Sequence, residues 1–260
     1  MRGSNKKAGT GKGRVILDGV IRKEGEPNLD GQVKETVRTL VRADGTKEIK
    51  KCVLVKEHSL TIRVNGEKKC HTVCSGEYLS EMAVGCLFTS GIISGKKEEI
   101  KEIIFDASSE NVNVIVCDNG TDNSDNSLKK VPEHEWKEEW IFEAAKLFSK
   151  GMPVHNITSG THACILAKRE KVLFICEDFG RRNTVLKAIG YAVLNDIDLS
   201  ECFLFISGRV LSDMMVHVIR SRIPLIVSKA VPTADAVRIA KEYGVTLIVK
   251  AYPDQIEICE

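Results

Sequence analysis

Short apolar runs alternate with helical patterns along the second half of the chain. The runs are flanked by Gly, Pro and charged residues and have the length of buried strands. Between them, apolar positions recur every three or four residues, which is typical of amphipathic helices. The expected strands are 163–167, 172–176, 202–207, 225–227, 246–249 and 256–259, and the expected helices are 133–150, 184–194, 210–220 and 234–243. Such alternation predicts an α/β layer sandwich, in which helices cover a mainly parallel sheet.

The first half has a different pattern, with short strands grouped before and after a single helix. The expected strands are 51–57, 60–64, 69–73, 100–105 and 112–116. A tight turn at Asn65-Gly66 joins two of them, and the helix is expected over 78–89. This grouping predicts a smaller α+β domain over residues 51–117.

Two polar stretches divide the chain. Residues 1–50 are rich in Gly, Lys and Asp, and they predict a basic, partly disordered arm and edge segment. The tract 118–127 contains no apolar residue, so it cannot bury surface to offset its ordering entropy. We therefore expect a mobile polar linker over 118–132, followed by a C-terminal domain over 133–260.

Composition and charge restrict the class of protein. The chain has 260 residues, of which 43% are hydrophobic and 28% charged, as in an ordinary soluble globular protein. Its net charge of +2 provides no global field for nucleic acid, and no apolar stretch has the roughly 18 residues needed to span a bilayer. The first residues lack the apolar segment of a secretory signal. We therefore expect a cytoplasmic protein with no nucleic-acid and no membrane partner.

Nine cysteines occur, most of them inside apolar runs where they act as small buried hydrophobic residues. Their odd number and the lack of a framework spacing favour a reduced compartment. Cys70, His71 and Cys74 have the spacing of a metal-binding fragment, but a second ligand pair is lacking. No metal site is expected, and no residue is expected to act as a catalytic group.

Candidate ligand contacts gather in loops at one edge of the expected C-terminal sheet. A strand ends in Glu177-Asp178, and a helix then begins within the basic stretch 180–183. A helix N-terminus has free N–H groups that bind anions, and Arg adds bidentate contacts to phosphate. Two further strand-to-helix loops contain Arg209 and Lys229, and the polar stretch 158–162 leads into the first strand. Because ligands bind at the carboxyl ends of strands in α/β sheets, these loops predict a phosphate- or nucleotide-containing ligand.

Single residues in these loops have distinct expected roles. The residues expected to contact the ligand are Arg181, Asn183 and Arg209. Asp178 is expected to orient one of the arginines or to cap a hydroxyl. His162 has two open interpretations, as a ligand contact or as a satisfied core histidine. Lys187 lies one turn into the helix and is expected in solvent.

The same loops contain three ordered motifs. They are Thr-Ser-Gly-Thr-His-Ala at 158–163, Glu-Asp-Phe-Gly-Arg-Arg-Asn at 177–183 and Ser-Gly-Arg at 207–209. Together with 60–66 and 81–93, these motifs resemble the formate dehydrogenase accessory sulfurtransferase family, FdhD. The resemblance covers about residues 50–260.

The resemblance implies a C-terminal domain with a cytidine-deaminase-like three-layer sandwich fold, a smaller N-terminal domain and a homodimer. Members of that family carry sulfur from a cysteine desulfurase to the molybdenum or tungsten bis-guanine-dinucleotide cofactor of formate dehydrogenase. They bind the guanine nucleotide of that cofactor in the C-terminal domain, and GDP is its mimic. The His-x-Glu and Pro-Cys-x-x-Cys signatures of zinc deaminases do not occur, so deaminase chemistry is not expected.

The loops and the resemblance together define the residues expected to bind the cofactor. These residues are Thr158, Ser159, Gly160, His162, Asp178, Gly180, Arg181, Asn183, Ser207, Gly208, Arg209, Lys250, Ala251, Tyr252, Pro253, Asp254 and Gln255.

The sequence departs from the family where sulfur is carried. The family's carrier is a Cys-x-x-Cys on a loop between the two domains, because a persulfide relay needs an exposed thiolate of low pKa. No Cys-x-x-Cys occurs in this chain, and residues 118–150 contain no cysteine. Cys117, just before the polar tract, could at most act as a lone thiol.

Two further departures affect the expected ligand site. The family's Gly-Arg-His-Asn is replaced at 180–183 by Gly-Arg-Arg-Asn, which exchanges a titratable imidazole for a fixed charge. Near the end of the chain, Tyr252 and Gln255 stand at positions that are usually basic. Asp254 would repel phosphate unless Lys250 compensates its charge.

Three functional hypotheses follow from these patterns. The first is an accessory protein for formate dehydrogenase maturation that resembles the sulfur carrier. The alternative is a non-catalytic, cofactor-binding chaperone that has lost sulfur transfer, as the missing cysteine pair suggests. The third is an unrelated nucleotide-binding enzyme on the same scaffold, for which a nucleophile or an acid–base pair in the loops is lacking.

Overall fold

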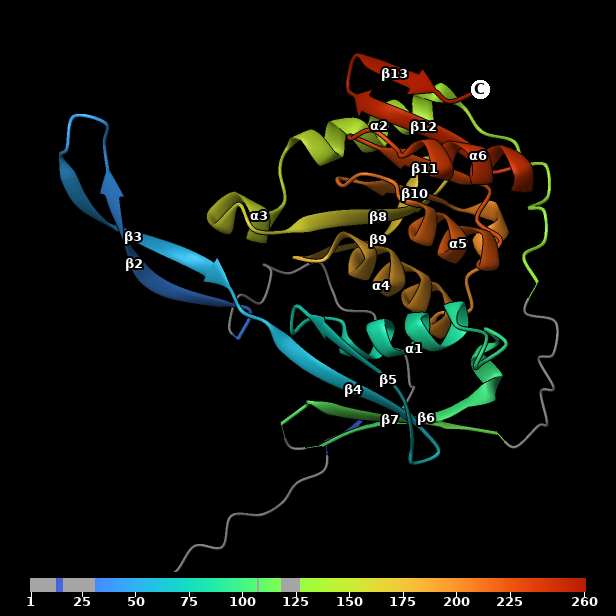
Figure 1. Cartoon of the computed structure of the whole chain (residues 1–260). Helices are drawn as coiled ribbons and strands as arrows, with labels where there is room; N and C mark the ends of the chain where they lie inside the picture. The colour runs from blue at the N-terminus through green and yellow to red at the C-terminus, as the bar shows by residue number, and fades with distance from the viewer. Residues whose placement is uncertain (1–12, 16–30, 107, 118–126) are drawn as a thin grey trace, which may run out of the picture.

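The computed structural model of the chain describes residues 13–15, 31–106, 108–117 and 127–260 (Figure 1). Most of the expected arm before residue 31 and the polar tract at 118–126 lie outside the described residues. The described strands form a six-stranded sheet, a five-stranded sheet and a two-stranded ribbon.

The six-stranded sheet belongs to the second half of the chain and has the strand order β13-β12-β11-β10-β8-β9. Its strands are β8 (His162–Lys168), β9 (Lys171–Asp178), β10 (Phe203–Ile206), β11 (Leu225–Ser228), β12 (Thr246–Tyr252) and β13 (Gln255–Ile258). Only the pairs β10–β11 and β11–β12 are parallel, and the other three pairs are antiparallel. The expected mainly parallel sheet is therefore wrong. The reason is that β8 and β9 are joined by a turn at Arg169-Glu170, and so short a connection can only join antiparallel strands.

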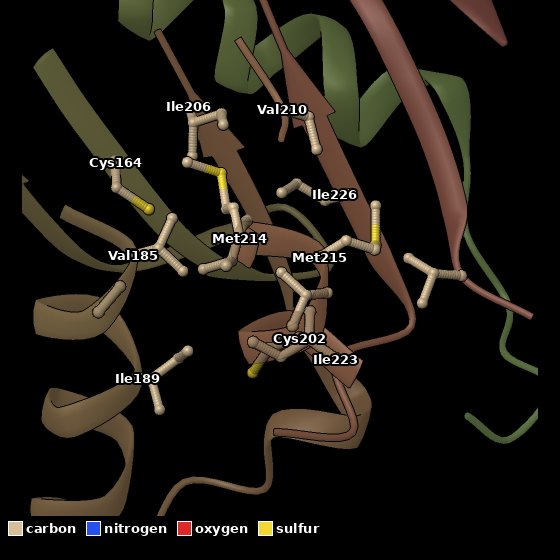
Figure 2. Close-up of a cluster of buried hydrophobic side chains, with 14 of the residues drawn as sticks. Cys164, Val185, Ile189, Cys202, Ile206, Val210, Met214, Met215, Ile223 and Ile226 are labelled. Carbon is tan, nitrogen blue, oxygen red and sulfur yellow. The ribbon is translucent and has the colours of Figure 1, made fainter. Parts of the chain in front are cut away.

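Helices cover both faces of this sheet. The helices α4 (Arg181–Leu194), α5 (Ser212–Arg220) and α6 (Ala234–Tyr243) share a core with one face, and α2 (Glu138–Ser149) shares a core with the other. Strand residues alternate between these cores, so Cys164 packs toward α4 and Ile165 toward α2. Figure 2 shows Val185 of α4 and Met214 of α5 gathered near Cys164 and Ile206 of the sheet. The second half is accordingly a helix–sheet–helix arrangement whose strands are apolar on both faces.

The five-stranded sheet belongs to the first half and has the order β1-β6-β7-β4-β5. Its strands are β1 (Gly13–Val15), β4 (His58–Val64), β5 (Glu67–Cys74), β6 (Ile100–Phe105) and β7 (Asn111–Val116), and the one-turn 3₁₀ helix η1 (Lys97–Glu99) precedes β6. Helix α1 (Leu79–Thr89) packs on this sheet, and its Met82 and Leu87 are buried with Leu60 and Ile62 of β4. This part of the chain thus has the expected helix and four of the expected strands, whereas the strand expected at 51–57 belongs to the two-stranded ribbon and β1 was not expected.

The helices α1 and α4 join the two sheets into one body, as Figure 1 shows. A Cβ on Gly85 of α1 would lie 1.9 Å from the backbone oxygen of Leu186, and a Cβ on Gly190 of α4 would lie 1.8 Å from that of Glu81. The two helix backbones therefore touch, which only glycine permits at these positions. Leu186 packs into the core of the five-stranded sheet, whereas Val185 packs into the core of the six-stranded sheet. Helix α4 is shared by both cores.

The ribbon of β2 (Val33–Val41) and β3 (Lys47–Val55) lies apart from both sheets (Figure 1). It crosses residue 50, so the boundary expected there is not a break in secondary structure, and β3 begins at Lys47 rather than at 51. Val37 and Ile49 on the ribbon are 63% and 76% exposed. At its base, Val55 lies close to Gly160, where an added Cβ would be 3.3 Å from Val55 Cγ2.

Two helices begin later than expected. Helix α2 begins at Glu138 rather than at 133, because Lys137 before it has an extended backbone with φ −135° and ψ 144°. The backbone N–H of Val131 in the preceding segment donates to Tyr243 O at the end of α6. Helix α5 begins at Ser212 rather than at 210, because Val210 forms a parallel β-bridge with Pro232. The one-turn 3₁₀ helix η2 (Leu199–Glu201) precedes β10.

A short helix, α3 (Pro153–Thr158), was not expected from the sequence. Gly151-Met152-Pro153 predicts only the end of α2, but Pro153 also occupies the first turn of α3, where its missing N–H costs nothing. Helix α4 begins at Arg181, within the basic stretch 180–183 where a helix start was expected and before the apolar pattern that begins at 184. Both helices border the loops in which ligand contacts are expected.

Candidate functional site

The sheet topology brings the expected loops to one edge of the six-stranded sheet, which we call the loop rim. The parallel strands β10, β11 and β12 end there, the antiparallel β8 begins there, and β9 ends there. Backbone hydrogen bonds join the loops to one another, from Ser207 to Ala163 O at 3.1 Å and from Lys229 to Ile206 O at 3.1 Å. The hydroxyl of Ser228 also donates to Gly208 O at 2.8 Å. The rim is therefore a connected structure rather than a set of separate loops.

His162, Ser207, Gly208 and Arg181 meet at the centre of the rim. His162 Nδ1 lies 3.2 Å from Ser207 Oγ, which also accepts from the backbone N–H of Ala163 at 3.0 Å. A Cβ on Gly208 would lie 3.0 Å from Arg181 Cβ and 3.2 Å from His162 Nδ1. Any larger residue at position 208 would displace one of these side chains.

His162 is held in its neutral form at neutral pH. Burial lowers its pKa, and the positive charge of Arg181 lowers it further. Because Ser207 Oγ accepts from Ala163, its own hydrogen is available to His162 Nδ1, which favours a proton on Nε2. His162 thus offers a neutral hydrogen-bonding group beside fixed positive charge.

Two arginines leave their guanidinium groups available at the rim. Arg181 is partly buried at the first position of α4, and Arg209 is exposed directly after Gly208. Neither guanidinium has a hydrogen bond or ion pair to any residue in the described part of the chain. Arg182 points elsewhere, since its Nη1 lies 3.5 Å from Asp213 of α5. Arg181, Arg209 and the N-terminus of α4 therefore concentrate positive potential at one place.

Asp178 is the centre of a buried polar network beneath the rim. Its Oδ2 accepts from Lys187 Nζ at 2.7 Å and from the backbone N–H and hydroxyl of Ser75 at 2.8 and 3.1 Å. Its Oδ1 accepts from the N–H of Gly180 at 2.8 Å and from Asn183 Nδ2 at 2.9 Å. Asp178 is fully buried and has both oxygens occupied. Asp178 accepts from a hydroxyl, that of Ser75, as one of its two expected roles states, whereas it orients no arginine among the described residues.

Lys187 and Asn183 also face this network rather than solvent. Lys187 is completely buried and donates to Ser75 Oγ at 2.7 Å as well as to Asp178, so the expectation of a solvated lysine is wrong. Asn183 is 6% exposed, and its amide nitrogen also donates to Val73 O at 2.9 Å. These bonds connect the end of β5 to the beginning of α4, and hence the first half of the chain to the rim.

Glu177 fixes the loop that precedes β8, a role that the sequence did not predict. Its carboxylate accepts from the backbone N–H groups of Val154 and His155 at 2.8 and 2.7 Å, which are free donors at the start of α3. It also accepts from Thr161 Oγ1 at 2.8 Å. The segment between these anchors contains Thr158, Ser159 and Gly160, of which Ser159 has a left-handed backbone with φ 52°.

The β12–β13 hairpin carries the remaining expected contacts. Ala251 is buried, whereas Tyr252 is 39% exposed and Pro253, Asp254 and Gln255 are exposed around the turn. Lys250 Nζ lies 3.0 Å from Glu257 Oε1, so it pairs with Glu257 and not with Asp254. Lys229 in the neighbouring loop lies over the Phe148 ring at 5.5 Å. Positive charge at the rim is therefore concentrated around Gly208 and not at this hairpin.

Other parts of the chain offer less for a ligand. A surface pocket of about 330 Å³, lined by Trp136, Trp140 and Arg169 among others, lies at the opposite edge of the sheet. No group of three or more His, Cys, Asp or Glu side chains could hold a metal ion within the described ranges. In the suspected metal fragment, His71 instead approaches Thr61 Oγ1 at 3.3 Å. None of the helices that the structure describes is long and apolar enough to cross a membrane.

The chain is similar in sequence to sulfur carrier proteins named FdhD. The chain is 26% identical over 219 residues to the sulfur carrier protein FdhD of Bacillus subtilis, an alignment that covers 75% of this chain and 83% of the relative. It is 27% identical over 209 residues to the FdhD of Methanothermobacter thermautotrophicus, covering 75% of this chain and 84% of the relative.

A solved structure resembles most of the fold. It is the crystal structure of a protein described as a formate dehydrogenase accessory protein from Desulfotalea psychrophila, with a TM-score of 0.77 and 23% identity. The match covers 87% of this chain and 96% of that one. The sequence model of the FdhD/NarQ family matches residues 55–132 and 115–259, which together span most of the chain. This chain belongs to the FdhD/NarQ family.

Proposed function

We propose that this chain acts in formate dehydrogenase maturation as a sulfur-carrying accessory protein that binds the guanine-nucleotide part of the molybdenum or tungsten bis-guanine-dinucleotide cofactor. Family membership supports the role in maturation. The observation that carries the binding part is the pair of available guanidinium groups of Arg181, whose side chain packs against Gly208, and of Arg209, the residue after Gly208. The fold of the C-terminal half is proposed to be the cytidine-deaminase-like sandwich.

The chemistry of the rim fits a phosphorylated ligand. Arg181 and Arg209 would hold phosphate oxygens by charge-assisted hydrogen bonds, with the free N–H groups at the start of α4 as further donors. Gly208 presents no side chain, which lets the ligand approach the backbone. His162 and Ser207, both uncharged, would meet neutral polar groups of the nucleotide. The cofactor itself would supply the metal–sulfur chemistry, and these residues would orient it.

The proposal includes partners that the family resemblance implies. The sulfur donor would be a cysteine desulfurase, the acceptor would be formate dehydrogenase, and the chain would act as a cytoplasmic homodimer. Analytical ultracentrifugation of the purified protein tests the homodimer directly. A monomer at the concentration used for the GDP titration would refute the homodimer.

Titration with GDP followed by calorimetry tests the binding site. We expect Arg181→Ala and Arg209→Ala each to weaken binding by about 1.5–3 kcal/mol, as loss of a charge-assisted hydrogen bond does. The matched control is Arg238→Ala on α6, whose guanidinium pairs with Glu242 and Asp235 away from the rim and should leave affinity unchanged. Absence of binding at roughly 1 mM GDP, where even weak complexes form, would remove the nucleotide part of the proposal.

A second candidate is a cofactor-binding chaperone without sulfur transfer. The lack of a Cys-x-x-Cys favours this alternative. Incubation with a cysteine desulfurase, cysteine and a persulfide-specific probe separates the two functions. A stoichiometric protein persulfide supports the carrier, whereas nucleotide binding without any persulfide supports the chaperone.

A further inference from the structure

Exposed apolar side chains gather in two places of the described structure. Ten large apolar side chains are exposed among the described residues, five of them on the β2–β3 ribbon and three at the loop rim or in α3 beside it. Those on the ribbon are Val37, Leu40, Val41, Ile49 and Leu54. Those near the rim are Ile157, Val231 and Tyr252. Apolar surface that is gathered in this way is typical of a binding surface.

The register of the ribbon places aliphatic and basic side chains on one face. Val37 is paired with Lys51, and Val41 is paired with Lys47. Residues directly opposite each other share a face, and so do residues two apart on one strand. Ile49, which is 76% exposed, therefore lies between the two lysines, and we call these five residues the ribbon face. Neither lysine forms an ion pair within the part of the chain that the structure describes.

The ribbon rises from the side of the molecule on which the loop rim lies. Strand β3 contacts α3, and Val55 at the end of β3 lies close to Gly160 in the loop before β8. Figure 1 shows the ribbon beyond α3, pointing away from the body of the molecule. Because Val37 and Ile49 are more than half exposed, the described residues of the same copy do not cover the ribbon face.

Two apolar surfaces on the same side of a molecule suit a dimer with a two-fold axis. In such a dimer the ribbon of each copy meets the rim of the other, so that both surfaces are covered at once. A ribbon of two nine-residue strands is roughly 30 Å long and roughly 10 Å wide, so one face offers roughly 300 Å². Two ribbon–rim contacts would bury roughly 1,200 Å² on both copies together, which reaches the range of stable interfaces.

The charge of the two surfaces indicates what lies between them. Residues 33–55 contain six Lys or Arg and three Asp or Glu, a net charge of +3, although the whole chain has only +2. The rim is also basic, because Arg181 and Arg209 leave their guanidinium groups available there. Two basic surfaces repel each other unless an anion lies between them. The lysines of the ribbon face therefore suit the phosphate groups of the ligand proposed for the rim.

We propose that the ribbon of one copy lies over the loop rim of a second copy, so that Val37, Val41 and Ile49 cover the apolar side chains there. Lys47 and Lys51 of that ribbon then bind phosphate groups of the ligand on the second copy. This inference rests on the nucleotide and homodimer parts of the proposed function. It adds the interface and two ligand contacts from the partner copy, without which each site is incomplete.

Analytical ultracentrifugation of the full-length protein tests the interface. A variant with both Val37→Asp and Ile49→Asp should sediment as a monomer at concentrations at which the wild type is a dimer, because it buries charge in the contact. Val231→Asp at the rim should have the same effect. The matched control is Leu40→Asp on the opposite face of the ribbon, which should remain a dimer. These positions are exposed, and circular dichroism checks that each variant is folded.

Mixed dimers test whether the partner copy completes the site. Arg209→Ala, and separately Lys47→Ala with Lys51→Ala, should each weaken GDP binding by at least about tenfold, as loss of a charge-assisted hydrogen bond does. After the two variants are mixed and exchange subunits, about a quarter of all sites combine an intact rim with an intact partner ribbon. Calorimetry should find that fraction binding GDP as the wild type does. If the ribbon served the rim of its own copy, mixing would restore no site.

The outcomes separate this inference from the proposed function. Ribbon and rim variants that remain dimers would overturn the inference and leave the homodimer with another interface. A monomeric wild type would overturn both the inference and the homodimer, and would assign the ribbon face to another occupant, such as residues 16–30 of the same chain or an unlike protein. Mixed variants without a restored site would overturn the shared site. Failure of the wild type to bind GDP would refute the nucleotide part and the role of the lysines, whereas sedimentation still decides the interface.

Discussion

Lys187 shows how a charged side chain can occupy a protein core when every neighbouring polar atom is used. Its ammonium group has no solvent contact and binds Asp178 and Ser75, and Asp178 in turn has both oxygens occupied. A buried ion pair of this kind does not by itself stabilise a fold, because desolvation offsets much of the attraction. Removing one partner is costly, since the other charge is then left buried and unpaired.

Lys187→Met should therefore lower the free energy of unfolding by about 3 to 5 kcal/mol, although methionine keeps the apolar stem. Urea denaturation followed by circular dichroism measures the change. Lys146→Met, which removes an exposed pair with Glu143, is the control and should change the free energy by at most about 1 kcal/mol. Adding Asp178→Asn to Lys187→Met should recover part of the loss, because no unpaired charge remains. Asp178→Asn alone, measured in the wild type, gives the reference. If the same substitution destabilises the Lys187→Met variant by as much as it destabilises the wild type, the buried charge was not the cause of the loss.

His217 on α5 makes stability depend on pH. Burial, and then the positive charge of Arg182, lower its pKa from 6.5 to about 4, against an opposing effect of Asp213. Its Nδ1 is buried without a hydrogen-bond partner among the described residues. The unfolded chain therefore binds a proton at His217 before the folded chain does, so this contribution is present above pH 6.5 and is lost as the pH falls towards 4.

The His217→Gln variant isolates this contribution. Between pH 7 and pH 4.5, the wild type should lose about 2 to 3 kcal/mol more stability than the variant, as the size of the pKa shift implies. Urea midpoints at the two pH values give the comparison. Parallel pH profiles for the two proteins would show that His217 is protonated in the folded state and would refute the inference.

At the scale of elements, the α1–α4 contact depends on two glycines. An added methyl group on Gly85 would meet a backbone oxygen, which cannot move as a flexible side chain can. Gly85→Ala should therefore destabilise the protein by about 1 to 3 kcal/mol, the range for overpacked cores, even though alanine favours helix. Gly76→Ala is the control, because the nearest atom to its added Cβ is 4.0 Å away. Thermal denaturation of both variants measures the difference. Equal melting temperatures for Gly85→Ala and Gly76→Ala would mean that α1 and α4 can move apart at little cost in free energy.

The elements also show what the sequence can and cannot predict. Strands such as β8 and β10 were predictable, because continuous apolar runs require burial on both faces. The antiparallel pairing of β8 was not, since apolar runs do not encode direction. The sequence of α4 held a signal that was missed: apolar residues on almost every side of that helix indicate complete burial, and therefore a buried Lys187.

The part of the candidate site that depends on where strands end was predictable from the sequence. Arg181 and Arg209 follow strand ends, and strand ends at one edge of a sheet come together. Roles that depend on distant segments were not predictable. Asp178 binds Ser75, and Asn183 binds Val73, in each case about a hundred residues earlier in the chain. No local sequence pattern predicts partners at such a distance.

At the scale of the whole molecule, two sheets from different halves of the chain share one helical layer. Helix α4 contributes to both cores, and the Ser75–Asp178–Lys187 network bonds the end of β5 to the loop rim. Two bodies that share a core lose each other's packing when either one unfolds. The fold therefore predicts one cooperative unit rather than two independent domains.

Urea denaturation followed by two spectroscopic probes tests whether the two halves unfold in one cooperative transition. Both tryptophans, Trp136 and Trp140, pack at the core between α2 and the six-stranded sheet, so their fluorescence reports the second half alone. Far-ultraviolet circular dichroism reports both halves, and in the wild type we expect the two urea transitions to coincide. Ser75→Ala should lower the midpoint of both probes by the same amount, because it weakens the buried network while the α1–α4 contact persists. A fluorescence transition displaced from the dichroism transition in the wild type would mean that the halves unfold separately, and that α4 keeps its packing on one sheet after the other has melted.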